Sequence, residues 1–327
     1  MPMALMRIIA AVATLIAAAA PAPAQDWPTR PVTIIVPFAA GGAFDVMVRV
    51  FSPHLTQILG QQVIVDNIGA AAGTVGTSRA AKAAPDGYTV LFGSVGTHAY
   101  NPSLYKKLPY NAVADFAPIA LVAEQPMVLL TRKDFPADTL QDFIAHVKAN
   151  AAKLQYGSAG VGSTTHLGCA LLNSAAGIEI THVPYRGGGP VMADLIAGQV
   201  HYMCSNSAGA LPQIQSNTLK GIALLARERT PLMPGLPTAH EQGLTEFEAI
   251  TWNAFFLPKG TPADIVKKLN AATVQMMDTP ALAERMQELG VTLVPSARRS
   301  PEYLQKFVER EIEKWGVPIK AAGISAD

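Results

Sequence analysis

Three glycine-rich bends carry the residues of this chain best suited to chemistry. They are VPFAAGGAFD (36–45), LFGSVGTH (91–98) and YGSAGVGSTTHL (156–167), each between a short apolar segment and a helical pattern. Such a bend points backbone N–H groups at one spot, where the positive end of the helix dipole also lies. No Lys follows the glycines, and only the first two glycines of a dinucleotide pattern are present, so the bends favour a carboxylate over a nucleotide phosphate.

Enzyme and metal motifs are missing from the sequence. The nucleophile pattern G-x-S-x-G is absent, and acidic residues are sparse near the bends, which disfavours an exported hydrolase or a glycosidase. The histidines lack H-E-x-x-H spacing, and methionines such as Met192 and Met203 do not cluster, which indicates packing residues. We therefore expect no catalytic activity, no cofactor and no metal.

The amino-terminal segment predicts export. Residues 1–24 hold Arg7, an apolar stretch and the small residues Ala22-Pro23-Ala24 of a signal-peptidase site, so the mature chain is expected to start at Gln25. Removing Arg7 from the 25 basic residues leaves 24 against 24 acidic ones. A neutral, soluble, exported chain disfavours nucleic acids and anionic membrane surfaces as partners.

The two cysteines, Cys169 and Cys204, leave two alternatives open. An exported protein can form a disulfide, but Cys169 falls on a predicted helix and Cys204 near the end of a predicted strand. Their separation does not show whether the two Cα atoms approach within bonding range. Buried free thiols are the favoured interpretation.

Strand and helix patterns alternate along the chain, as in α/β proteins with a parallel or mixed sheet. Strands are expected at 31–37, 62–66, 88–92, 127–131, 154–157, 180–184, 200–205, 219–226 and 250–257. Helices are expected at 45–59, 73–83, 139–149, 163–176, 188–197, 262–278, 280–289 and 301–314. The chain length predicts two lobes, the first from 25–122 and 226–327 and the second from 123–225, with a cleft between them.

Several motifs together resemble one protein family. In order they are WPTRPVTIIVPFAAGGAFD, APDGYTVLFGS, NPSLYKKLPYNAVADFAPI, YGSAGVGSTTHL, VPYRGGGP, MPGLPTAHEQG and LPKGTPADIVKKLN. This order resembles the extracytoplasmic receptors of tripartite tricarboxylate transporters, the Bug family. The resemblance implies a two-lobed α/β periplasmic binding protein of the Venus-flytrap kind, type II-like, with two crossover segments, which holds a small carboxylate in its cleft.

The resemblance also implies the binding residues. One wall of the cleft is expected to comprise Phe38, Ala39, Gly41, Gly42, Ala43 and Asp45, with Ser94 and Thr97 beside them. The other wall is expected to comprise Ser158, Gly162, Ser163, Thr164 and His166. The stretch Cys204–Ser207 lacks the acidic residue common in this family, which disfavours an amine on the ligand. Asn67-Ile68-Gly69 also lacks the usual Pro, which affects a loop more than the site.

Each of these residues has a structural alternative. Asp45 at a helix start is expected to cap free N–H groups and to pair with Arg49. Phe38 is assigned to the cleft in preference to the core. Ser163 and Thr164 can cap a helix and face the ligand at once, whereas His166 one turn into a helix favours packing.

Three further polar residues are candidates from their positions alone. Arg186 could clamp a carboxylate through its guanidinium, although the glycines after it suggest an exposed turn. Asn206 and Ser207 follow a predicted strand end and are included as polar contributors. Trp252 is assigned to the core.

These observations predict a periplasmic receptor that closes two lobes on a small carboxylate and delivers it to the membrane permease subunits of a secondary transporter. It is expected to act as a monomer. A ligand-loaded partner of a membrane sensor protein is the alternative in a different class, and an exported hydrolase is a weaker one. Aliphatic diacids, aromatic acids, tricarboxylates and amino acids all remain open as ligands, the last disfavoured.

Overall fold

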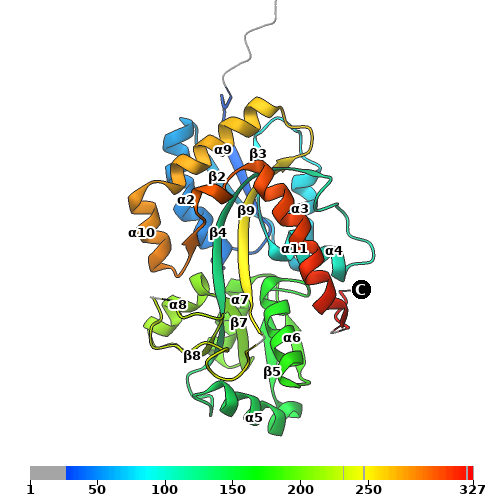
Figure 1. Cartoon of the computed structure of the whole chain (residues 1–327), viewed down its shortest axis with the longest axis vertical. Helices are drawn as coiled ribbons and strands as arrows, with labels where there is room; N and C mark the ends of the chain where they lie inside the picture. The colour runs from blue at the N-terminus through cyan, green and yellow to red at the C-terminus, as the bar shows by residue number, and fades with distance from the viewer. Residues whose placement is uncertain (1–26, 231, 246, 322, 327) are drawn as a thin grey trace, which may run out of the picture.

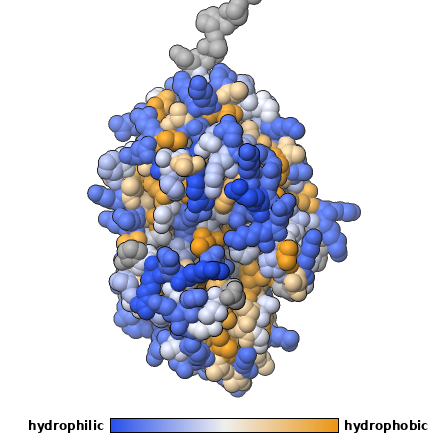
Figure 2. All heavy atoms as spheres, viewed as in Figure 1, coloured by the Kyte–Doolittle hydropathy of each residue, from blue (hydrophilic) through white to orange (hydrophobic). Residues whose placement is uncertain are grey.

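The computed structural model describes residues 27–230, 232–245, 247–321 and 323–326. The expected signal peptide at 1–24 and the expected start at Gln25 therefore lie outside the described residues. Figure 1 shows two lobes stacked along the long axis and joined by the long strands β4 and β9. In Figure 2, hydrophilic side chains cover most of the upper lobe on this face, and apolar ones gather at the waist and along one side of the lower lobe.

The first lobe begins with the predicted strand, bend and helix units. Apolar β-branched residues form its first strands, and helices with one apolar face cover them. Its strands are β1 (Val32–Val36), β2 (Val63–Asn67), β3 (Thr89–Ser94), β9 (Ile250–Pro258) and β10 (Thr292–Leu293). Its helices are α2 (Ala43–Leu59), α3 (Thr74–Ala81), α4 (Asn101–Leu104), α9 (Ala263–Met277), α10 (Pro280–Glu288) and α11 (Pro301–Ala321).

The second lobe repeats the same alternation. Its strands are β5 (Gln155–Ser158), β6 (Thr181–Pro184), β7 (Tyr202–Asn206) and β8 (Leu219–Leu225). Its helices are α5 (Leu140–Asn150), α6 (Thr164–Ala176), α7 (Gly188–Ala197) and α8 (Ser207–Gln215). Alternate residues of one strand face opposite sides of a sheet. Accordingly, Met127 and Leu129 pack with α5 and α6, whereas Val128 and Leu130 pack with α7 and α8.

Strand β4 (Phe116–Arg132) connects the lobes. It pairs antiparallel with β9 from Phe116 to Pro126 and then with β7 and β8 from Met127 onward. The sheet order is β2-β1-β3-β9-β4-β7-β5-β6, with β8 and β10 also paired to β4. Both β4 and β9 therefore pass the waist side by side (Figure 1).

The predicted strand at 127–131 is eleven residues too short at its beginning, because the strand starts at Phe116 rather than at residue 127. Pro118 lies inside it, and proline normally interrupts a ladder because it lacks an N–H donor. The β4–β9 register shifts between Pro118 and Ala120, so the ladder absorbs the proline at an irregularity. The turn-like composition of 101–119 explains why the sequence did not predict the beginning of this strand.

The return from the second lobe comes later than the sequence suggested. Met233 and Leu236 belong to one apolar cluster of the second lobe, and Phe247 and Ala249 belong to the other. Ala249 N–H donates to Leu225 O at 2.8 Å, which holds this segment on β8. We therefore propose lobe boundaries near residues 123 and 250 in place of 123 and 225.

The favoured interpretation of the cysteines as free thiols is wrong. Cys169 on α6 and Cys204 on β7 form a disulfide, with their Cα atoms 5.3 Å apart. The two elements pack against each other, which brings the pair within the range that a bridge requires. The bridge lies fully buried inside the second lobe.

Trp252 lies in the core of the first lobe, as predicted. Its side chain is buried, and its Nε1–H donates to Glu311 Oε2 at 2.8 Å. Within residues 27–326, as far as they are described, none of the helices combines the length and apolar character that a membrane span requires.

Candidate functional site

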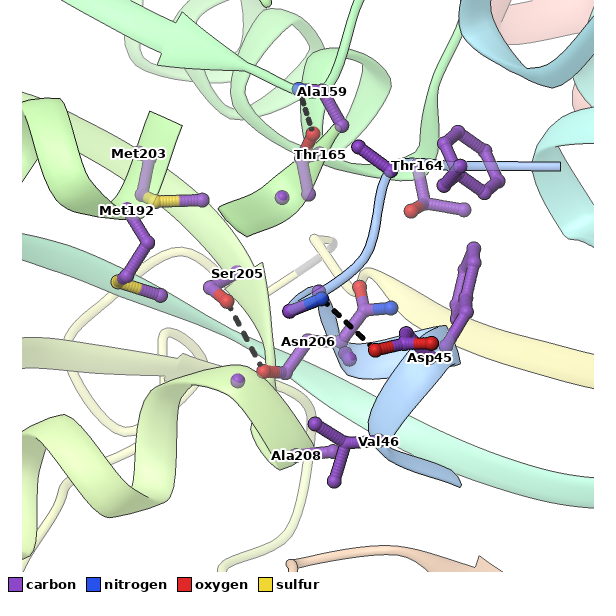
Figure 3. A pocket seen from close by; sticks show the side chains of 18 of the residues that line it. Asp45, Val46, Ala159, Thr164, Thr165, Met192, Met203, Ser205, Asn206 and Ala208 are labelled. Atoms are coloured by element: carbon purple, nitrogen blue, oxygen red, sulfur yellow. Dashed lines mark hydrogen bonds between the residues drawn. The ribbon is translucent and has the colours of Figure 1, made fainter. Parts of the chain in front are cut away.

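A cavity of about 170 Å³ lies where the bends of the two lobes meet (Figure 3). It is lined by the ends of strands and the starts of helices from both lobes, the position at which open α/β sheets bind ligands. The first lobe contributes Phe38, Ala39, Gly41, Gly42, Ala43, Phe44, Asp45 and Val46. The second lobe contributes Ala159, Thr164, Thr165, Gly188, Met192, Met203, Ser205, Asn206, Ala208, Gly209, Pro212 and Gln213.

The first-lobe wall is the bend between β1 and α2. Gly41 has φ of +82°, a conformation that favours glycine, and it turns the chain into the helix. The first-turn N–H groups of Ala43 and Phe44 have no acceptor among the described residues. These N–H groups at the positive end of a 17-residue helix are free to bind an anion.

Asp45 pairs with Arg49 as predicted, but it does not cap the first-turn N–H groups of α2 and instead holds the bend before the helix. Its Oδ2 accepts from Gly41 N–H at 2.9 Å, and Arg49 Nε donates to both of its oxygens at 3.0 Å. Burial alone would raise the pKa of Asp45, but the bonds from Arg49, Gly41 and Asn67 outweigh it, so the pKa lies below 3.8. The carboxylate lines the cavity but is already paired.

The start of α6 forms the opposite wall. Ser163 caps the helix, since its Oγ accepts from His166 N–H at 3.2 Å. Thr165 Oγ1 accepts from Ala159 N–H at 2.8 Å, a bond drawn in Figure 3. Thr164 is different, because neither its hydroxyl nor its backbone N–H bonds to a described residue. Thr164 therefore presents two unpaired donors at the cavity.

Helices α7 and α8 complete the site. Gly188 is the first residue of α7, and the Cβ position of Gly42 lies only 3.5 Å from its backbone nitrogen. Asn206 ends β7 immediately before α8, and it is 2% exposed. Its side chain does not cap α8, in contrast to Ser163 on α6.

Unpaired N–H groups, rather than cations, give the cavity its positive character. The starts of α2, α6 and α7 converge on it, and the described residues of its lining include no Lys, Arg or His. Helix starts bind small anions through their N–H groups and dipoles. Met192, Met203 and Phe38 supply an apolar surround that excludes water and strengthens such contacts.

The two lobes touch closely at glycines beside the cavity. A Cβ on Gly187 would lie 2.8 Å from Ala39 Cβ, and one on Gly69 would lie 2.8 Å from Arg186 O. A Cβ on Gly189 would lie 2.8 Å from Ala40 O. The structure therefore shows the lobes closed, with backbone against backbone.

Eight of the predicted residues line the cavity. They are Phe38, Ala39, Gly41, Gly42, Ala43, Asp45, Thr164 and Asn206. Phe38 also packs edge-on against Phe44, with ring centroids 5.1 Å apart, so it serves both the cleft and the core.

Ser94 and Thr97, in the bend after β3, do not line the cavity. Ser94 N–H donates to Thr97 Oγ1 at 3.0 Å, and that hydroxyl also pairs with His98 Nδ1 at 2.9 Å. Both side chains are fully buried. Their polar groups form hydrogen bonds within the bend and are not directed at the cavity.

Three residues of the second-lobe bend shape it from within. His166 Nδ1 accepts from Gly162 N–H at 3.1 Å, and Ser158 Oγ pairs with His182 Nε2 at 2.6 Å. The rings of His166 and His182 stack 4.3 Å apart. Burial lowers the pKa of His166 to about 3 and that of His182 to about 4, so both are neutral and neither adds positive charge.

The remaining predicted residues also lie outside the cavity lining. Arg186 is exposed, as the glycines after it suggested. Ser207 Oγ donates to Gly290 O at 2.5 Å. Ser163 is used as a helix cap.

Twelve lining residues were not predicted, and half of them belong to α7 and α8. Gly188 lies in VPYRGGGP, and Ala208 and Gly209 follow β7 in SNSAGA. Both segments are strand-to-helix bends rich in small residues, the same signal that identified the first wall. Extending that signal to these bends would have located the other half of the second-lobe wall.

Metal binding finds no support in the part of the chain that the structure describes, where no three His, Cys, Asp or Glu side chains gather as metal ligands would.

Comparison with known proteins identifies relatives over most of the chain. The family model for the tripartite tricarboxylate transporter family receptor matches residues 47–324. The periplasmic binding protein BugD has a structure with a TM-score of 0.89 at 37% identity, over 91% of this chain and 99% of that one.

Two further solved structures contain ligands. MatC from Rhodopseudomonas palustris, with bound malate, is 38% identical with a TM-score of 0.87, over 90% of this chain and 100% of that one. Rpa4515 from R. palustris, with adipate, is 34% identical with a TM-score of 0.88, over 92% of this chain and 99% of that one. These likenesses cover both lobes.

Proposed function

The chain belongs to the tripartite tricarboxylate transporter receptor family, and on that premise we propose that it is a periplasmic receptor that captures a small carboxylate between its lobes for uptake. The proposal is carried by one observation. Unpaired N–H groups at three helix starts converge on an interlobe cavity whose described lining has no cationic side chain. Relatives with malate and adipate bound support the same ligand class.

The mechanism is binding without bond chemistry. A carboxylate enters the open cleft, and N–H groups from α2 and α6 replace its hydration as the lobes close. Each charge-assisted bond contributes about 1.5 to 3 kcal/mol, so a few suffice once ordering costs are met. The binding residues that we propose are the cavity-lining ones, with Thr164 as the principal hydroxyl donor.

A thermal-shift screen over carboxylates tests the proposal. A ligand at 100 times its dissociation constant should add about 2.7 kcal/mol of stability, and succinate, malate, adipate, citrate and benzoate cover the main classes. Absence of a shift with every one of them would contradict the function.

Two neighbouring variants test the assignment of the second-lobe wall. Thr164→Val removes an unpaired hydroxyl and should weaken carboxylate binding about tenfold in calorimetry, with little change in stability. Ser163→Ala removes a cap and should lower stability by about 1 kcal/mol. If the two variants showed the opposite pattern, the assignment would be wrong.

We further propose that the closed receptor, acting as a monomer, docks on the membrane permease subunits. The cavity in the described structure is complete within one chain, and closure brings surfaces of both lobes together. A pull-down with permease subunits, with and without ligand, should show ligand-dependent capture. Ligand-dependent capture of a membrane sensor protein alone would favour the sensor role instead.

A further inference from the structure

Asn206 presents an amide without a partner at the cavity. The residue is 2% exposed, and Figure 3 draws its side chain among those that line the site. Its Oδ1 is buried without a donor, and its Nδ2 makes no hydrogen bond to any residue that the structure describes. Buried amides are nearly always paired, so this one awaits a partner from outside the chain.

Three other polar side chains of the lining are already engaged. Ser205 Oγ donates to the backbone oxygen of Asn206 at 3.2 Å, and Thr165 Oγ1 holds Ala159 N–H. The carboxylate of Asp45 bonds to Gly41 N–H and Arg49. These groups are engaged, and the amide still offers one acceptor beside one donor group.

We propose that Asn206 selects ligands that carry a hydroxyl on the carbon next to a carboxylate, that is, 2-hydroxycarboxylates. A carboxylate oxygen accepts from Nδ2, and the neighbouring hydroxyl donates to Oδ1, so both ends of the amide are satisfied at once. An acid without the hydroxyl leaves Oδ1 buried and unpaired, which penalises its binding. The inference rests on the proposed carboxylate function and specifies its ligand class.

A 2-amino acid fits the same hydrogen bonds but not the charge. Asp45 is the one ionisable side chain in the described lining, and Arg49 already neutralises it at 3.0 Å. An ammonium group would therefore enter a cavity of converging helix starts without a free carboxylate to balance it. The structure favours the neutral hydroxyl over the charged amine.

Matched ligands test this selection by calorimetry on the purified protein. Succinate, each enantiomer of malate, and aspartate share four carbons and differ at C2 in bearing hydrogen, hydroxyl or ammonium. Adipate and 2-hydroxyadipate repeat the comparison at greater length. We expect one malate enantiomer, or 2-hydroxyadipate, to bind about 10- to 100-fold more tightly than its unsubstituted partner, and aspartate to bind more weakly than malate.

Variants at the same position link the preference to Asn206. Asn206→Leu keeps the size and removes the amide, so the hydroxy and unsubstituted acids should bind within about threefold of each other. Val317→Ala, at an exposed position outside the lining, should leave the preference unchanged. If the leucine variant fails to fold, the isosteric Asn206→Asp replaces it and should shift the malate-to-aspartate ratio at least about tenfold toward aspartate.

The outcomes separate the two proposals. Carboxylate binding without a hydroxyl preference, or a preference that survives Asn206→Leu, overturns the role of Asn206 and leaves the carboxylate receptor standing. Failure of every carboxylate in the screen removes the function and this inference together.

Discussion

The bend after β1 and the bend after β3 end neighbouring parallel strands, yet only the first faces the cavity. Thr33 on β1 pairs with Thr89 on β3, so both strands reach the same edge of the sheet. The first bend, with Ala39, Gly41 and Gly42, lines the cavity. The second, with Ser94 and Thr97, is fully buried and bonds to itself.

The difference shows how a glycine bend becomes a binding site. Hydroxyl side chains satisfy the N–H groups of their own bend, as Thr97 does for Ser94. The Ala and Gly residues of the first bend have no hydroxyl, and Asp45 accepts only from Gly41 N–H, so the N–H groups of Ala43 and Phe44 remain for a ligand. In the second lobe, the hydroxyls of Ser158, Ser163 and Thr165 likewise form hydrogen bonds within the lobe. The side chains of Thr164 and Asn206 form none with the described residues and remain for a ligand.

Disrupting the contact between Ala39, in the bend after β1, and Gly187 of the second lobe should have the largest effect on carboxylate binding. Gly187→Ala places a methyl group within 3 Å of Ala39 and should resist closure, weakening carboxylate binding about 10- to 100-fold in calorimetry. Gly235→Ala, where nothing lies within 4 Å, is the matched control. Equal affinities for the two variants would show that closure does not need this contact.

Breaking the second bend should affect stability rather than binding. Thr97→Val keeps the shape of the side chain and removes the acceptor of Ser94 N–H, so we expect about 1 to 3 kcal/mol less stability in denaturant unfolding. Carboxylate affinity should remain within about twofold of the wild type. A large loss of affinity without a loss of stability would place Thr97 in the site.

As the pH falls, the free energy of unfolding should decrease first through His98, in the bend after β3, and only at lower pH through Asp45, in the bend after β1. Burial lowers the pKa of His98 to about 3, so the unfolded chain, with its His near 6.5, binds more protons between these values and stability falls as the pH drops below 6.5. From pH 7 to 5 we expect His98 to account for on the order of 1 to 2 kcal/mol, and His98→Gln to show a correspondingly smaller decline. Parallel declines would exclude His98 as a source.

Asp45→Asn, in the bend after β1, should have the smallest effect on stability of these variants. Its lowered pKa means that its stabilisation is present above about pH 4 and disappears as the pH falls through the folded-state value. The variant should be about 1 kcal/mol less stable at pH 7 and equal to the wild type near pH 2 in thermal unfolding. A stability difference that persisted at low pH would indicate a loss of packing instead.

Much of the fold could be predicted because its signals are local. Apolar runs, glycine caps and small-residue bends fixed elements such as α7, which matches its predicted range of 188–197. The long strand β4 could not be predicted, because its pairing with β9 overrides Pro118 and lies far along the chain. The disulfide depends on the packing of α6 against β7, which no local pattern reveals.

The cavity was only half predictable, for a related reason. Residue type shows that Ser94 and Ser158 can form hydrogen bonds, but it does not show that Ser94 Oγ already accepts from Thr97 N–H or that Ser158 Oγ already donates to Gly160 O. Arg186 likewise has suitable chemistry but lies exposed. Thr164 and Asn206 matter because their neighbours leave them unpaired, and that property belongs to the folded structure.

The disulfide gives the site a dependence on the compartment in which the chain resides. Cys169 lies on the helix that starts at Thr164, and Cys204 lies two residues before Asn206. A covalent bond thus fixes the spacing of the two unpaired residues of the second lobe. Such bonds persist in oxidising compartments and are rare in the reducing cytosol. An oxidising compartment therefore maintains a covalent link in this wall of the cavity that a reducing one would not.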